Sequence, residues 1–418
     1  MSVHKSMLLL AIALAPNGGA MAQGPAITIA GARARAQQVS AELDVAREAV
    51  AVARGLERQS GAYPNPLISY SRERVGGGAQ SASQDIVAAG QALEWPSLRA
   101  ARREAASARR QAAEARLAEV EGQVAFDAVR LYAASFAAER RARLADTVAA
   151  AFATAVAVSD RRLAEGDISG FAARRIRLEA ARYAVQRTQA SLDQRSAVIA
   201  LASALGDATP PAELRVAGWS GNIALALSTD SLVALALHHR GVLAAGEFDV
   251  EAARADARRA SSERLPTPAL SIGAKSEELP GGARLNGLVI GAALPLAVWD
   301  RRSGLVAASD ADVRRASADL ASVRLRVTRE VRAAAEAFHA AQEQLGAVGA
   351  AVQADAAAAL RSAQTAYVEG EATLLEWLDT VRAYQETEVA IANLRAEVLL
   401  RAAALERAAG APLFQELR

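Results

Sequence analysis

The sequence contains no cysteine, and this absence excludes several kinds of site. Without thiols the chain has no disulfide framework, zinc ribbon, thiol nucleophile or iron–sulfur cluster, and no N-terminal cysteine for a bacterial lipid anchor. Aromatic residues are also scarce, at 4% of 418 residues, and alanine is the most frequent of the hydrophobic residues, which make up 52%. Alanine favours helices, whereas aromatic and β-branched residues favour strands. The composition therefore predicts long, closely packed helices and little sheet.

An excess of charge of one sign is missing as well. Lysine and arginine total 48 and aspartate and glutamate 46, so the formal net charge is only +2. Such a balance gives no field for binding a polyanion, and no nucleic acid partner is expected. The chain also lacks a phosphate-binding loop, a nucleophile elbow and a His-Glu-x-x-His motif. We therefore expect no enzyme, no cofactor and no stored metal.

Long hydrophobic runs are absent, and the one short run is at the N-terminus. Met7 to Ala15 is apolar, follows Lys5 and precedes Ala20-Met21-Ala22, a small-x-small cleavage pattern. About nine residues cannot span a membrane as a helix. The pattern predicts a secretory signal over residues 1–22 and a mature protein that leaves the cytoplasm without a membrane-spanning helix.

An internal repeat organises the rest of the chain. Pro64-Asn65-Pro66 recurs as Pro266-Thr267-Pro268, and the tract around Gly166 recurs around Gly370. Matches in the same order at nearly constant separation indicate a duplicated unit. We predict a first repeat over residues 23–220 and a second over residues 221–418.

Each repeat ends in two long segments without proline. The predicted helices are Ser97–Glu165, Phe171–Leu205, Leu305–Glu369 and Glu371–Ala409. Apolar residues recur in them at spacings of three and four, which is typical of one buried helical face. Glycine commonly ends a helix, so Gly166 and Gly370 mark the bends of two helical hairpins.

A shorter helix and a pair of strands precede each hairpin. The predicted strands are Pro66–Glu73, Gln84–Trp95, Ala269–Lys275 and Leu288–Leu294. Apolar and small residues alternate in them, and glycine-rich turns lie between the members of each pair. Four short strands cannot close a barrel, and an open sheet with an apolar face invites aggregation. We expect further strands to come from other copies of the chain.

This order of elements resembles the TolC family of outer-membrane efflux channels. The tracts Tyr63–Pro66, Gln91–Pro96, Leu294–Arg301 and Tyr367–Gly370 resemble the branch that contains the CzcC-like metal-resistance proteins. The resemblance implies a mainly α fold with a small β part, in which the duplicated hairpins form an α-barrel. It further implies a homotrimer with a 12-stranded barrel in outer-membrane lipid, a periplasmic adaptor protein and an inner-membrane efflux pump. The exported substrate would be small molecules or metal cations.

The resemblance also assigns roles near the bends. In the family the bends point into the periplasm and meet the adaptor. The docking residues would be Arg162, Leu163, Gly166, Ile168, Ser169, Tyr367, Gly370, Leu374 and Leu375. Each of these glycines could instead do no more than terminate a helix.

Two carboxylates follow the second bend. Glu376 and Asp379 are three residues apart and so share one helical face, where three copies would bring six carboxylates toward one axis. Relatives carry acidic residues at similar positions, so these two are the predicted channel gate, although a solvated helix face is the alternative. Ala172 and Ala372 stand where a salt-bridged gate would need charged residues, which argues against such a gate.

The four histidines do not suggest a metal site. His4 lies in the predicted signal, His339 is isolated, and the adjacent His238 and His239 point about 100° apart on a helix. Two other functions are the alternatives, a periplasmic adaptor and a structural coiled-coil protein. Adaptors have one hairpin between β-rich halves, and a coiled coil does not need the paired Pro-x-Pro strand tracts.

Overall fold

The computed structural model describes residues 26–76, 81–207, 214–219 and 223–417. The helices are α1 (Ile29–Val39), α2 (Ala41–Ser60), α3 (Pro96–Glu165), α4 (Gly170–Ala204), α5 (Thr229–His239), α6 (Gly241–Ser262), α7 (Ser303–Val348), α8 (Ala350–Glu369), α9 (Leu374–Ala409) and the short 3-10 helix η2 (Gln415–Leu417). The strands are β1 (Leu67–Val75), β2 (Ala82–Ala92), β3 (Ala269–Glu278) and β4 (Arg284–Ala293). The predicted mainly helical fold with a small β part is confirmed. The predicted signal, residues 1–22, lies outside the described residues.

The two halves of the chain share their order of elements and their local geometry. Two short helices, two strands and a long hairpin occur in the first half and again in the second. Gly166 and Gly370 end α3 and α8 in the left-handed conformation, with φ of 84° and 85°. Ser40 and Arg240 interrupt the short helices with nearly the same extended φ and ψ. The predicted boundary between residues 220 and 221 lies outside the described residues, and the division into repeats stays a prediction.

Two expectations about helix continuity were wrong. The single short helix expected before each strand pair is two helices, because the chain turns through extended backbone at Ser40 and Arg240. The helix expected over Leu305–Glu369 is also interrupted, at Gly349, whose φ of 20° and ψ of 165° are not helical. Two glycines within four residues weaken the helix there, and the Gly349 N–H turns back to the Gly346 carbonyl. The first half has no such glycines, and α3 runs without interruption for 70 residues.

The strands form one antiparallel sheet in the order β1-β2-β3-β4. The β2–β3 pair joins the two halves of the chain, with Gly90 opposite Ser271. Gly273 permits close approach at this seam, because a Cβ at that position would collide with the Val87 carbonyl and with Ala88. β1 and β4 each have one neighbour within the protomer, so both outer edges of the sheet are open.

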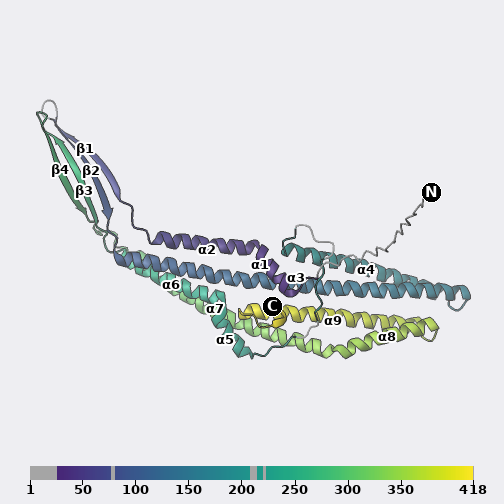
Figure 1. Cartoon of the computed structure of the whole chain (residues 1–418). Helices are drawn as coiled ribbons and strands as arrows, with labels where there is room; N and C mark the ends of the chain where they lie inside the picture. Colours follow the sequence, from purple (N-terminus) through teal and green to yellow (C-terminus); the bar gives the residue numbers. More distant parts are fainter. Residues whose placement is uncertain (1–25, 77–80, 208–213, 220–222, 418) are drawn as a thin grey trace, which may run out of the picture.

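The helices are arranged as a layer one helix thick (Figure 1). Near the sheet the order across the layer is α2, α3, α6, α7, and near the bends it is α4, α3, α9, α8. The sheet lies at one end of the molecule and both bends lie at the other (Figure 1). Each helix therefore has neighbours only at its sides, and the outermost helices lack a neighbour on one side.

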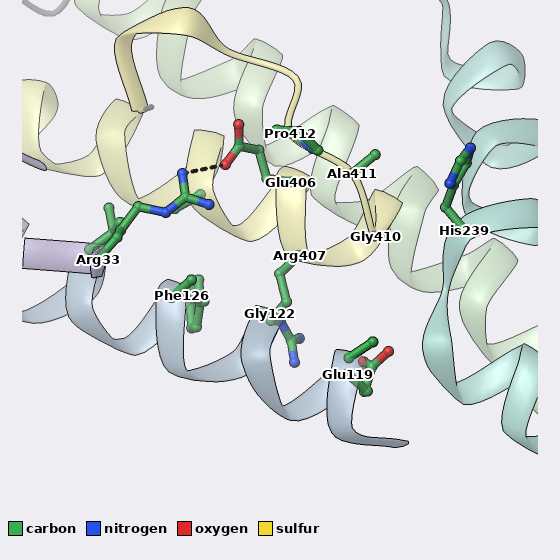
Figure 2. A pocket seen from close by; sticks show the side chains of 14 residues that line it. Arg33, Glu119, Gly122, Phe126, His239, Glu406, Arg407, Gly410, Ala411 and Pro412 are labelled. Carbon is green, nitrogen blue, oxygen red and sulfur yellow. Dashed lines mark hydrogen bonds and ion pairs between the residues drawn. The ribbon is translucent and has the colours of Figure 1, made fainter. Parts of the chain in front are cut away.

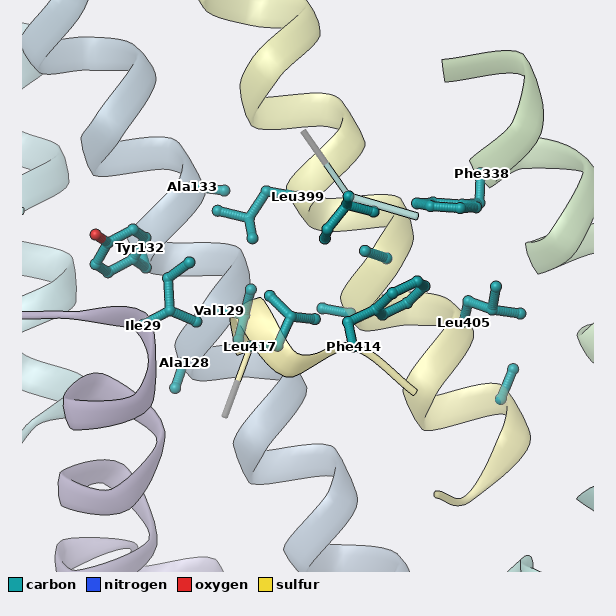
Figure 3. Close-up of a cluster of buried hydrophobic side chains, with 14 of the residues drawn as sticks. Ile29, Ala128, Val129, Tyr132, Ala133, Phe338, Leu399, Leu405, Phe414 and Leu417 are labelled. Atoms are coloured by element: carbon teal, nitrogen blue, oxygen red, sulfur yellow. The ribbon is translucent and has the colours of Figure 1, made fainter. Parts of the chain in front are cut away.

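The main core lies midway along this layer, where α1, α5 and the C-terminal tail cover the long helices. Figure 3 shows Phe338, Leu399 and Phe414 meeting there, and the Phe338 and Phe414 rings are 5.2 Å apart. On the opposite wall Tyr132 donates a hydrogen bond of 2.8 Å to the Ala217 carbonyl, and burial raises its pKa to about 12. This core fixes the two halves of the chain against each other.

Among the described residues, α3 alone has an 18-residue window that is apolar enough to cross a membrane. About a third of that window is buried, and side chains such as Val148, Phe152 and Ala155 pack into the core near the bends. The apolar character of α3 therefore reflects its central position in the layer, between α4 and α9.

A buried arginine fastens the second short-helix pair to the long helices. Arg240 is 5% exposed and lies at the turn between α5 and α6. Its guanidinium donates to both carboxylate oxygens of Glu119, at 2.9 and 3.2 Å, to Glu330 at 3.3 Å and to the Ala408 carbonyl at 3.0 Å. A buried charge needs partners of this kind, so one side chain connects α3, α7 and α9.

Replacing Gly241 with alanine should destabilise this junction. The added Cβ would collide with the Ala115 carbonyl on α3, and backbone cannot move aside as a flexible side chain can. We expect Gly241→Ala to cost about 1–3 kcal/mol and to lower the unfolding temperature of the detergent-solubilised protein. Gly122→Ala is the control: its Cβ would meet nothing within 4 Å, and helical alanine should be neutral or stabilising. Equal unfolding temperatures for the two variants would contradict the role of this contact.

Candidate functional site

One face of the sheet is apolar and uncovered. Residues directly opposite each other in an antiparallel pair share a face, so the registers assign every strand residue to one of two faces. The large apolar residues of this face, here called the outer face, are Ile68, Tyr70, Val87, Leu270, Ile272, Leu288 and Ile290. They are between 49% and 76% exposed. An uncovered apolar band on strands of 9–11 residues is what a lipid-facing surface requires.

The opposite face, here called the inner face, is mixed. It carries small and polar residues together with Leu67, Val75, Ile86, Leu285 and Val289. Ser69 and Ser271 lie on it beside Gly90, Gly273 and Gly291. Space is tight between them, since a Cβ at Gly291 would lie 2.7 Å from the Ser271 Oγ. Small and polar residues suit the water-filled side of a channel wall.

Apolar residues continue below the sheet, in the segment between β4 and α7. The exposed residues there are Leu294, Leu296, Val298 and Trp299, and Trp299 is 94% exposed. Across the sheet, the Trp95 indole donates a 3.0 Å hydrogen bond to the Pro266 carbonyl and ties the end of β2 to the start of β3. Indole rings at this level match the interfacial aromatics of membrane strands.

At the other end of the molecule, the structure brings the two predicted bends together. Both end in the same left-handed turn: the Asp167 N–H donates to the Arg162 carbonyl at 2.9 Å and the Glu371 N–H to the Ala366 carbonyl at 2.8 Å. The Arg162 guanidinium of the first bend lies over Gly370 of the second, 3.4 Å from the position of a Cβ there. The two bends thus form one surface.

Stacked aromatic rings hold the bends in this arrangement. Trp377 is fully buried, and its ring lies 5.3 Å from that of Tyr367 and 4.8 Å from that of Phe152. Phe152 in turn stacks on Tyr183 at 4.3 Å. The stack joins α3, α4, α8 and α9. In the sequence Trp377 lies between the two gate candidates, yet its role was not predicted. The signal that could have indicated it is that aromatic residues make up only 4% of the chain.

Some of the predicted docking residues are exposed on the surface of the bends, and the others are partly or fully buried beneath it. Gly166, Ser169, Gly370 and Leu375 are exposed, while Arg162, Leu163, Ile168 and Leu374 are partly buried. The Ser169 hydroxyl caps α4 by accepting a 3.2 Å hydrogen bond from the Ala172 N–H. Tyr367 is only 5% exposed, so it supports the bend from below and contributes little to its surface.

Both predicted gate carboxylates are exposed, and each has a local partner. Glu376 forms a capping box with Thr373: its Oε2 accepts from the Thr373 N–H and hydroxyl, both at 2.8 Å, and its N–H donates to the Thr373 Oγ1 at 3.3 Å. These hydrogen bonds lower the pKa of the Glu376 carboxyl. Asp379 lies 3.8 Å from Arg382 on the same helix. Glu376 is therefore ionised at neutral pH and held in one orientation.

A cavity of about 250 Å³ lies where α3, α9 and the C-terminal tail meet (Figure 2). His239 lines it, together with two carboxylates that already have partners. Glu406 pairs with Arg33 at 3.0 Å and accepts from two backbone N–H groups, and Glu119 pairs with Arg240. Within the described part of the chain, no three His, Cys, Asp or Glu residues are grouped so that they could hold a metal ion. The cavity is lined by structural ion pairs.

Comparison with known proteins relates the chain to outer-membrane efflux proteins. Residues 232–411 match the family model described as outer membrane efflux protein, and this region contains α6, β3, β4 and α7 to α9. The chain is 24% identical over 320 residues to the cobalt-zinc-cadmium resistance protein CzcC of Cupriavidus metallidurans, a match that covers 76% of this chain and 75% of that protein. The matches are to transport proteins, and they favour an outer-membrane efflux channel over the adaptor and coiled-coil alternatives.

Solved structures of outer-membrane channels share the fold over most of this chain. The outer-membrane channel OprN superimposes with a TM-score of 0.75 at 19% identity, covering 92% of this chain and 90% of that one. The channel CusC gives a TM-score of 0.75 at 17% identity and covers 96% of both chains. The predicted TolC-like architecture of strands and long helical hairpins is confirmed.

Acid should loosen the start of α9 through Glu376. The Glu376 carboxyl has a lower pKa in the folded protein than in the unfolded chain, where the value is 4.5. Its charge therefore stabilises the folded protein fully above pH 4.5, and this stabilisation is lost as the pH falls through the pKa of the folded state. Hydrogen-exchange protection of the first turn of α9 should therefore fall as the pH is lowered below 4.5 and through the lower pKa of the folded state. In Glu376→Gln, which keeps a capping box but does not titrate, protection should be independent of pH. Parallel pH profiles for the two proteins would refute this role.

Proposed function

We propose that three copies of this chain form a closed duct that carries divalent metal cations across the outer membrane. Each protomer would contribute four strands to a 12-stranded barrel and four helices to each level of an α-barrel. The observation that carries the proposal is that both the sheet and the helical layer end in open lateral edges. Threefold closure would pair β1 with β4 of the next copy and leave no free strand edge in lipid.

The open flank of α4 has the pattern of a helix that packs against another helix. Its exposed large apolar residues are Phe171, Leu178, Val185, Leu192 and Ile199. They recur every seven residues over five positions and are between 52% and 71% exposed. A strict seven-residue period is the signature of a left-handed supercoil, in which such residues insert between those of a neighbour. Within the protomer this row, here called the α4 stripe, has no partner.

The flank of α8 offers a complementary surface. Its exposed small residues are Ala351, Ala354, Ala358, Ser362 and Thr365, at spacings of three and four. Small side chains leave hollows that can receive larger ones. Since α4 and α8 are the two edges of the layer near the bends, ring closure would place the α4 stripe of one protomer against α8 of the next.

The joined bends are the surface on which we expect a periplasmic adaptor to dock. They lie at the end of the molecule opposite the membrane-facing sheet (Figure 1). The exposed residues Gly166, Gly370 and Leu375 leave room and apolar area for a partner helix. An adaptor would connect the duct to an inner-membrane pump, which supplies the energy and selects the cargo.

The choice of metal cations as cargo rests on two observations. The curated relative CzcC is named for resistance to cobalt, zinc and cadmium. In addition, Glu376 and Asp379 are exposed carboxylates at the bend end of the helical layer. If they line the bore, a trimer presents six negative charges, which favour passage of cations. The duct needs no stored metal, because a cargo must leave as readily as it enters.

Charges on the α4 stripe should abolish the trimer. In Leu178→Glu/Val185→Glu two carboxylates would have to be buried at the seam without partners, and we expect the trimer fraction in detergent to fall at least tenfold. Ala184→Glu adds a carboxylate at an exposed position about 100° around α4 from Val185 and should leave the trimer intact. Sedimentation with native electrophoresis measures both. A trimer that tolerates the stripe variant, or no trimer in the wild type, would refute the proposed assembly.

Neutralising the gate should remove the cation preference. We expect the ratio of cation to anion permeability in planar bilayers to fall toward one in Glu376→Gln/Asp379→Asn, because the glutamine preserves the helix cap while the charge is lost. Asp167→Asn removes a carboxylate from the first bend and should have little effect.

The absence of cysteine permits a second test of the gate. Asp379→Cys would be the only thiol in the protein, so a charged thiol reagent acts at that position alone. Modification by a positively charged reagent should reduce single-channel conductance if the residue lines the bore. An unchanged conductance would place residue 379 on the outside of the duct.

A further inference from the structure

The register of the sheet divides its outer face into two zones. Starting from the end nearest the helices, the first rows across the sheet contain apolar residues. The next row contains Arg72, Asp85, Ser276 and Asn286, and the row at the hairpin tips contains Arg74, Ser83, Glu278 and Arg284. All four strands change character at the same level, so the outer face has a sharp upper limit to its lipid-facing zone.

The zone beyond this limit is positively charged on the outer face. Three arginines face two carboxylates there, so the net charge is positive for each protomer. On the inner face at the same level, Glu73 and Glu277 outnumber Lys275. At the same level of the sheet, the outer face therefore carries net positive charge and the inner face net negative charge. A hairpin tip that only contacts water would not need this separation of charge.

The three arginines differ in whether their charge is already paired with a carboxylate of the protein. Arg72 lies 3.7 Å from Asp85, which also accepts a 2.8 Å hydrogen bond from the Tyr70 hydroxyl. Arg284 lies 3.8 Å from Glu278, and its side chain is 73% exposed. Arg74 is exposed and makes no ion pair with any residue that the structure describes. Arg284 has one long contact and a more exposed side chain than Arg72, 73% against 58%. The guanidinium groups of Arg74 and Arg284 can therefore turn toward an external anion.

We propose that Arg74 and Arg284 bind the phosphate groups of outer-leaflet glycolipid, whose acyl chains cover the apolar rows nearer the helices. The proposal rests on the proposed function, because it takes the hairpin tips to be the outer end of a trimeric barrel. A lipid with phosphates on its headgroup matches both zones at once: apolar chains against Tyr70 and Leu288, and phosphates two rows further along the strands. Guanidinium groups bind phosphate with two parallel hydrogen bonds, and in the trimer β1 would lie beside β4 of the next copy. Arg74 and Arg284 would then come from adjacent protomers and flank one seam.

The test compares two faces of the same sheet. Full-length protein in detergent is titrated with lipid A carrying two phosphates, and bound lipid is measured by native mass spectrometry. We expect Arg74→Gln/Arg284→Gln to weaken binding about twentyfold, since each cation near a charged lipid surface contributes about fivefold. Lys275→Gln removes one positive charge from the inner face and should bind within about twofold of the wild type.

Two further arms identify the source of the phosphate. Dephosphorylated lipid A should bind the wild type as weakly as the phosphorylated lipid binds the double variant. Inorganic phosphate at millimolar concentration should not displace the lipid, because it lacks the acyl chains. Displacement by inorganic phosphate, equal weakening by Lys275→Gln, or no preference of the wild type for the phosphorylated lipid would each overturn the proposal.

The same samples separate this inference from the proposed function. The double variant should remain trimeric and conduct as the wild type does in bilayers, since neither arginine faces the inner side. A trimer that conducts but fails the lipid comparison would refute the glycolipid site alone. A wild type that neither assembles nor conducts would refute the proposed function.

Discussion

The constraint on which this structure depends is that its helices form a layer only one helix thick. In a globular protein, a helix buries its apolar face against a second layer. Here, outside the central core, helices pack only against their lateral neighbours, and the alanine-rich composition allows them to approach closely. Such a layer leaves both of its faces uncovered, as the wall of a water-filled tube requires. It also leaves two edges that the chain cannot cover by itself.

The remaining features follow from stiffening and closing that wall. The central core and the Arg240 junction fix the short helices against the long ones. The aromatic stack around Trp377 fixes the two hairpins where they bend. Between these two points polar contacts such as Arg141 to Asn393 and Gln353 to Glu388 link the long helices. Gly349 interrupts the helical path between α7 and α8 in this region, while α3 continues unbroken. The two halves of the chain therefore differ in the part of the wall that any opening motion would have to bend.

The sheet, like the helical layer, has two different faces and two open edges. Its outer face is apolar over the rows nearest the helices, and its inner face carries the serines and glycines, a division that suits lipid on one side and water on the other. Open edges at β1 and β4 would be costly in lipid, where unpaired backbone groups find no hydrogen bonds. The edges of the sheet and of the helical layer thus point to the same symmetry. The proposed cation selectivity at the bends and the proposed glycolipid binding at the tips would be separate properties of the two ends of one wall.

The sequence alone determined the elements and their order. Proline-free alanine-rich stretches, the glycines at residues 166 and 370, and alternating residues beside Pro-x-Pro tracts specify helices, bends and strands through local backbone preferences. The seven-residue period of the α4 stripe was equally visible, but whether that row was covered was not. Only the tertiary structure decided that Arg162 lies over Gly370, that Arg240 holds three helices, and which strand residues share a face with Arg74. Those contacts join segments that are far apart in the chain. Local backbone preferences do not determine them, because such preferences do not depend on which distant side chain a residue meets.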